Sequence, residues 1–171
     1  MSWKDGKAWS DRFLPEIKAI LGQHLIAEPP VEEDMRHNTD LIVLRLDAVR
    51  IGCRVRRYQY VHSFGGEFTI RTGARGGVKT EITKIIEGWG DYFLYAFADP
   101  QERALHQWTL CDLNVFRIWH SRRLFADKAM PGKTHPNGDG TALTAFRFAD
   151  LPPHFVVASS AQHVEQEAAW A

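Results

Sequence analysis

Acidic and guanidinium side chains recur at the starts and along the lengths of three apolar stretches between residues 38 and 84. Asp40 precedes the first stretch, Arg54 and Arg56 alternate along the second, and Glu67 opens the third. Two or three carboxylates can hold a magnesium ion, and a cation can stabilise the charge that develops on a phosphate during phosphodiester cleavage. We therefore expect the two carboxylates to be metal ligands and the two arginines to contact the scissile phosphate, so that all four are candidate catalytic residues.

The charge distribution supports a polyanionic partner for the same region. The chain of 171 residues has a formal net charge of zero, yet residues 45–84 contain nine lysines and arginines against three acidic residues. Arginine is rarely buried without a partner, so such strands usually face a polyanion, a carboxylate cluster or water. We expect Arg71, Arg75 and Lys79 to follow a nucleic-acid backbone. The alternative is that these cations pair with carboxylates on an exposed sheet face.

The elements that would position these residues form the first half of the chain. Helical spacing of apolar residues predicts a helix over 11–25, ended by the prolines that follow. Strands are predicted at 41–46 and 50–58, joined by a tight turn at 47–48, and at 66–71. Successive strands with short connections favour a three-strand antiparallel meander. Alternation along these strands would place Arg54 with Arg56, and Glu67 with Arg71, on polar faces.

The second half completes an α/β fold with a mixed sheet flanked by helices. Periodicity and capping residues predict a helix after Thr80, with an apolar stripe at Ile82, Ile85, Ile86 and Trp89. A strand covered on both faces is predicted at 91–97, and another strand at 105–111. A helix capped by Asp112 follows at 113–124, then a turn-rich segment at 128–140 and a strand at 143–148. We expect residues 1–150 to form a single domain and residues 151–171 to form a loosely structured C-terminal tail.

This order of elements resembles the core of the PD-(D/E)XK nuclease superfamily. The resemblance rests on a helix with Glu16, on Asp40 at a strand start, and on Arg54-Val55-Arg56 fourteen residues later. The chain also resembles small phage and prophage proteins in its segments Asn-Thr-Asp at 38–40, Cys-Arg-Val-Arg-Arg at 53–57, Phe-Thr-Ile-Arg at 68–71 and Gly-Trp-Gly-Asp-Tyr at 88–92. The resemblance covers about residues 10–124, and it implies a restriction-endonuclease-like domain with magnesium-dependent cleavage of nucleic acid.

The chain departs from that family's Glu-x-Lys motif, because Arg54 and Arg56 occupy the two charged positions. Arginine cannot ligate magnesium and does not give up its proton at neutral pH. A second carboxylate would have to come from Glu67, or else from Glu16 or Asp91. Two hypotheses follow: a magnesium-dependent nuclease, or a catalytically inactive nucleic-acid-binding or protein-interaction module of the same fold.

A second motif lies between the third strand and the following helix. Residues 73–80 match the phosphate-binding pattern GxxxxGK[ST] except at Val78, where glycine is required for close approach of the backbone to phosphate. This departure argues against a nucleotide triphosphatase. The loop could still contact a nucleic-acid phosphate through Arg75 and Lys79, or it could serve only as a connection.

Cysteine usage and hydropathy favour a cytoplasmic protein without a membrane segment. Cys53 and Cys111 are the only cysteines and form no CxxC spacing, which argues against a disulfide framework or a zinc ribbon. No stretch approaches the roughly 20 apolar residues of a membrane span, and the N-terminal residues lack an apolar signal region. The histidines show no paired metal-ligand spacing.

Overall fold

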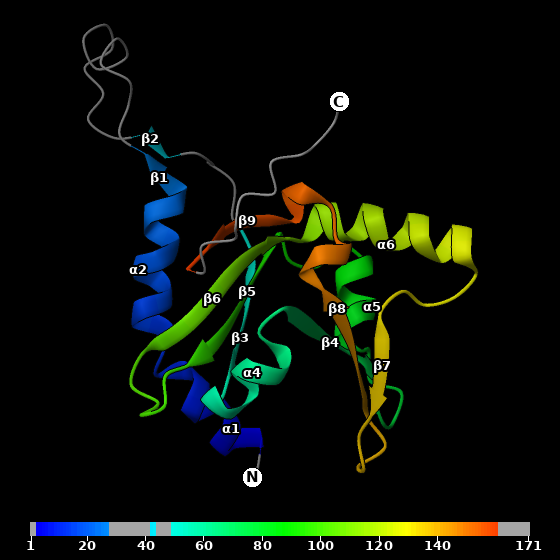
Figure 1. The fold of residues 1–171 in the computed structure, drawn as a ribbon, viewed down its shortest axis with the longest axis horizontal. Coiled ribbons are helices and arrows are strands. Elements are labelled where there is room, and N and C mark those ends of the chain that lie inside the picture. Colours follow the sequence, from blue (N-terminus) through cyan, green and yellow to red (C-terminus); the bar gives the residue numbers. More distant parts are fainter. Residues whose placement is uncertain (1–2, 28–41, 44–48, 161–171) are drawn as a thin grey trace, which may run out of the picture.

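The computed structural model describes residues 3–27, 42–43 and 49–160. The helices are α1 (Trp3–Asp11), α2 (Leu14–Leu25), η1 (Tyr58–Tyr60), α4 (Val61–Phe64), α5 (Glu81–Ile86), α6 (Leu113–Asp127), η2 (Phe148–Asp150) and η3 (Pro153–Phe155). The strands are β1 (Ile26–Ala27), β2 (Ile42–Val43), β3 (Ile51–Arg56), β4 (Glu67–Gly73), β5 (Tyr92–Ala98), β6 (Leu105–Asp112), β7 (Lys133–Pro136), β8 (Ala142–Arg147) and β9 (Val156–Ser159). Figure 1 shows their arrangement.

The larger sheet has four strands in the order β3-β5-β6-β9 and is mixed. β3 and β5 are parallel, whereas β5 with β6 and β6 with β9 are antiparallel. Parallel neighbours require a crossover connection, which η1, α4, β4 and α5 supply between β3 and β5. The predicted α/β class with a mixed sheet and flanking helices is therefore confirmed.

The predicted meander is wrong in the identity of its strands. An antiparallel three-stranded sheet exists, but its order is β4-β8-β7, so β3 and β4 belong to different sheets. β2 pairs with β1 rather than with β3 among the described residues. The partner of β4 lies some 70 residues later in the chain, with Phe68 opposite Phe146. Alternation within a strand does not specify its neighbour, and this pairing is fixed by aromatic residues that meet in the core.

Strand β5 organises the core because both of its faces are buried, as predicted. Phe93, Tyr95 and Phe97 join one apolar cluster with α5, α6 and the smaller sheet. The alternate residues of β5 join a second cluster with Phe13, which lies just before α2, and Ile17, which lies in the first turns of α2. In Figure 1, α2 lies at the left beside β6, and α5 and α6 lie at the right towards the smaller sheet.

Local helix signals are confirmed at the caps and fail at one end of α5. Thr80 accepts a hydrogen bond from the Thr83 backbone N–H, and Asp112 accepts from the first residues of α6. The predicted stripe is only half correct, because Ile86 and Trp89 are 39% and 66% exposed. α5 ends at Ile86, and the chain then turns through Gly88, whose φ is 94°. The helical period therefore does not reach Trp89.

Three further expectations need correction. The predicted helix over 11–25 corresponds to α2, which begins at Leu14 and has Pro15 in its first turn, where the missing N–H costs little; α1, which precedes it, was not predicted. The turn-rich segment at 128–140 contains β7, which pairs with β8. The tail prediction is wrong for η3 and β9, because Phe155 is fully buried and β9 pairs with β6; residues 161–171 lie outside the described residues.

In the described part of the chain, no helix is both long and apolar enough to cross a membrane.

Candidate nucleic-acid interface

A hollow of about 580 Å³ lies where α1, β3 and β4 approach one another. Its lining includes five cationic side chains, those of Lys7, Arg54, Arg56, Arg57 and Arg71, and no carboxylate. Two aromatic residues, Trp9 and Tyr60, also line it. Carboxylates that do not line the hollow form ion pairs with some of these cations. The partners of each cation therefore decide how much of its positive charge remains available to a ligand.

Arg54 is committed to the protein itself. Its Nη1 donates to the Thr69 carbonyl at 2.6 Å, and its Nη2 donates to the Glu81 carboxylate at 2.6 Å. The same carboxylate oxygen of Glu81 accepts the Arg71 backbone N–H at 2.9 Å. Because β3, β4 and α5 meet at these bonds, Arg54 joins the two sheets through a half-buried ion pair.

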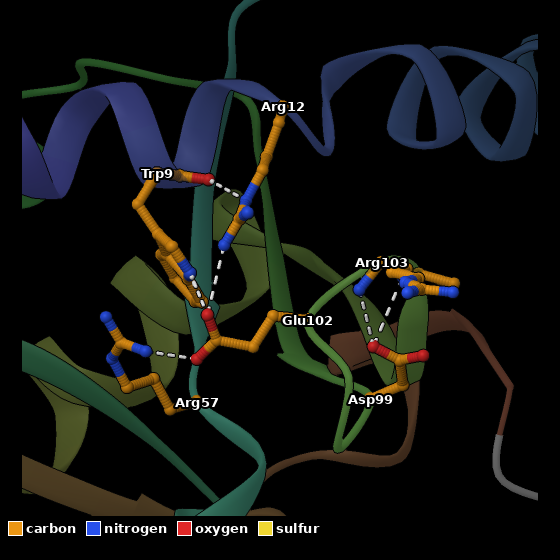
Figure 2. Close-up of polar contacts among 7 residues, drawn as sticks. Trp9, Arg12, Arg57, Asp99, Glu102 and Arg103 are labelled. Atoms are coloured by element: carbon orange, nitrogen blue, oxygen red, sulfur yellow. Dashed lines mark hydrogen bonds and ion pairs between the residues drawn. The ribbon is translucent and has the colours of Figure 1, made fainter.

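Arg57 is held by Glu102, which also binds Trp9 and Arg12 (Figure 2). The Trp9 indole N–H donates to this carboxylate at 2.7 Å, and the Arg12 Nη2 donates at 3.0 Å. The Trp9 hydrogen bond, followed by the charge of Arg57, lowers the pKa of Glu102 below its ordinary value of 4.5. Glu102 therefore fixes α1 against the end of β3 and supports one wall of the hollow.

The turn between β5 and β6 delivers Glu102 to this position. Glu102 adopts a left-handed backbone conformation with φ of 56°, which is uncommon for a residue with a side chain. Asp99 stabilises the turn, because its carboxylate accepts the backbone N–H groups of Arg103 at 2.7 Å and Ala104 at 3.3 Å (Figure 2). A turn far from the arginine-rich stretch in sequence thus orients one of its cations.

Arg56 and Arg71 differ from the other three cations of the hollow because neither side chain forms an ion pair with another described residue. The Arg56 Nη1 donates to the hydroxyl of Tyr95 at 3.1 Å. Its guanidinium carbon lies 4.8 Å from the ring centroid of Tyr60 and 5.1 Å from that of Phe64. Arg56 is therefore oriented by neutral groups and keeps its charge uncompensated, whereas Arg71 is exposed.

The predicted catalytic quartet is not brought together among the described residues. Arg54 and Arg56 share a face of β3, as alternation predicts, and both line the hollow. Glu67 instead lines a second hollow of about 780 Å³, where it lies opposite Arg147 in the β4–β8 ladder. Asp40 lies outside the described residues. The salt-bridge alternative holds for Arg54, whereas Arg56 forms no ion pair with another described residue.

Glu16 and Asp91, the other candidates for the second carboxylate, accept hydrogen bonds from the backbone. Glu16 accepts the Leu105 backbone N–H at 2.9 Å, and Asp91 accepts the Arg50 backbone N–H at 2.8 Å. In the described part of the chain, no three His, Cys, Asp or Glu side chains gather into a group that could hold a metal ion. The predicted magnesium site, which depends on Asp40, stays a prediction.

The two cations of the loop at 73–80 that were expected to bind phosphate both lie near carboxylates of the protein. Lys79 forms an ion pair with Glu87 at 2.8 Å. Arg75 lies beside the turn that contains Asp139, where hydrogen bonds from Thr141 chiefly lower the pKa of the Asp139 carboxyl and the charge of Arg75 adds to the effect. Of the three cations expected to follow a nucleic-acid backbone, Arg71 alone lines the hollow of five cations.

Sequence reasoning missed the contribution of the N-terminal segment and of the residues just after β3. Lys7 and Trp9 come from α1, Tyr60 comes from η1, and Arg57 lies between β3 and η1. For α1, the signal that could have been used is the spacing of Gly6, Trp9 and Ser10, which places these residues on one face of the helix.

Comparison of the chain with protein-family models, with curated proteins and with solved structures gives no match in any of the three.

Proposed function

We propose that this protein binds nucleic acid through the hollow between α1, β3 and β4. The observation that carries the proposal is a concave surface lined by five cations and no carboxylate in a chain of zero net charge. Local basicity of this kind is the electrostatic footprint of a phosphate-binding surface. Arg56 and Arg71 supply the phosphate contacts, because a planar guanidinium presents several N–H donors in a geometry that suits phosphate oxygens.

The partners of the other cations support this division of roles. Asp11, Glu81 and Glu102 compensate Lys7, Arg54 and Arg57, respectively. These three cations shape the walls, and two remain to attract a polyanion. A surface with few uncompensated charges predicts modest affinity and a measurable dependence on salt, because each neutralised phosphate releases counterions.

We propose as further hypotheses that the chain has a restriction-endonuclease-like fold and that it cleaves nucleic acid. A restriction-endonuclease-like domain of a phage or prophage protein would combine a mixed sheet with a helix-containing crossover, and the β3–β5 connection has that form. Magnesium-dependent cleavage would require Asp40 and a second carboxylate near Arg56. The two free cysteines fit a cytoplasmic protein.

The test uses the purified chain with fluorescently labelled single- and double-stranded DNA and RNA, followed by fluorescence anisotropy. We expect binding that weakens measurably, by about several-fold, between about 50 and 200 mM salt. A parallel incubation with magnesium or manganese detects cleavage and includes Asp40→Ala and Glu67→Ala. Cleavage lost in Asp40→Ala alone would favour a nuclease whose second ligand is not Glu67. Absence of binding at low salt with every probe would refute the proposed function.

A further inference from the structure

The hollow has the dimensions of a site for one small chemical group rather than for a duplex. Its volume of about 580 Å³ lies within the range of roughly 300 to 1,000 Å³ that is typical of small-ligand pockets. Proteins that read duplex DNA usually insert a helix or a β-ribbon into a groove about 12 Å wide. A concave surface between α1 and two strands does not enter such a groove, whereas its volume is of the size that holds one small group such as an unpaired nucleotide.

Arg56 is positioned to bind a phosphate within the hollow. The rings of Tyr60 and Phe64 lie near its guanidinium, and Tyr95 accepts one of its hydrogen bonds. An arginine side chain carries five N–H donors, and here one donates to a neutral hydroxyl. The aromatic contacts orient the guanidinium plane without neutralising it, so the remaining donors can meet phosphate oxygens.

Tyr60 provides an aromatic surface beside that phosphate position. It lines the hollow and is 37% exposed, although Arg56 lies against its ring. Proteins that bind single strands stack bases on exposed aromatic rings next to basic residues, whereas a duplex keeps its base faces covered. We infer, on the basis of the proposed function, that the hollow accepts an unpaired nucleotide of a single strand, with its phosphate on Arg56 and its base against Tyr60.

The experiment compares a labelled single strand with a duplex of the same sequence, in DNA and in RNA, at one low salt concentration. We expect the wild-type chain to bind the single strand about 10-fold or more tightly than the duplex. Tyr60→Ala should weaken single-strand binding by roughly 5- to 150-fold, the range for loss of one stacked base, while Tyr60→Phe should retain it. Trp89→Ala removes an aromatic residue that does not line the hollow and is the matched control.

A second variant keeps the inference testable if Tyr60→Ala does not fold. Arg56→Lys retains the charge but loses the planar fork, so it should weaken single-strand binding by several-fold. Duplex binding equal to or tighter than single-strand binding would overturn the inference and leave the proposed function intact. So would equal effects of Tyr60→Ala and Trp89→Ala in folded proteins. Absence of binding to every probe would overturn both.

Discussion

Replacing Glu81 by glutamine tests whether the Arg54 ion pair joins the two sheets. Glu81 accepts hydrogen bonds from the Arg54 guanidinium and from the Arg71 backbone N–H. Glutamine has nearly the same shape but no charge, so Arg54 would remain half-buried without a charged partner. Hydrogen bonds to charged groups contribute about 1.5 to 3 kcal/mol. We therefore expect Glu81→Gln to lower the free energy of unfolding by that amount, or the melting temperature by roughly 3 to 12 °C.

The same helix offers a matched control, because Glu87 forms an ion pair with Lys79 just beyond the end of α5. The Lys79 and Glu87 side chains are 62% and 39% exposed, against 25% and 27% for Arg54 and Glu81. Exposed pairs contribute about 0 to 1 kcal/mol, so Glu87→Gln should change stability little. Urea denaturation of both variants measures the difference. Equal effects of the two substitutions would refute the structural role of the Arg54 pair.

Loss of the Glu81 charge has a second expected result at the hollow. Arg54 would no longer be compensated by a carboxylate, so the positive charge available to a polyanion would increase. Glu81→Gln should therefore tighten nucleic-acid binding and steepen its salt dependence while it destabilises the fold. Anisotropy titrations at several salt concentrations measure this change, and weaker binding by a folded variant would contradict it.

The remaining predictions concern α1 and the C-terminal segment. The pKa of Glu102 is lower in the folded state, so its contribution to stability is present above about pH 4.5 and is lost as the pH falls through that lowered pKa. The difference in melting temperature between wild type and Glu102→Gln should therefore shrink in acid. A difference that stays constant from about pH 6 to about pH 3 would argue against the contact. Phe155 is fully buried against Phe68, and Phe155→Ala should cost about 3 to 5 kcal/mol in urea denaturation. Phe125→Ala, at an exposed position of α6, should have little effect, and equal losses in the two variants would show that η3 and β9 do not stabilise the core.

The sequence predicted the elements whose signals are local. Thr80 and Asp112 cap helices by hydrogen bonds within three residues, and the short, continuous apolar run of β5 is typical of a strand with two covered faces. The alternation that puts Arg54 and Arg56 on one face of β3 is local as well. These predictions needed no knowledge of which elements become neighbours.

The parts that failed depend on contacts between distant segments. Phe68 pairs across β4 and β8 with Phe146, and nothing within the β4 sequence indicates that partner. Glu67 consequently lies beside Arg147 rather than beside Arg56. Glu102 reaches Arg57 from a turn 45 residues away, so the charge balance of the hollow could not be read from the arginine-rich stretch itself. Pairing of distant side chains, rather than local propensity, decides which cations remain available.

The most direct test replaces the two cations of the hollow between α1, β3 and β4 that lack an ion-pair partner among the described residues. The double variant Arg56→Gln/Arg71→Gln should bind a single strand more weakly than wild type. The slope of log affinity against log salt should become shallower by about 1.4, because each lost contact to a single-strand phosphate removes about 0.7. Arg147→Gln removes a cation of the other hollow and should leave the slope unchanged. An unchanged slope in the double variant, or an equal change in Arg147→Gln, would contradict nucleic-acid binding at the hollow between α1, β3 and β4.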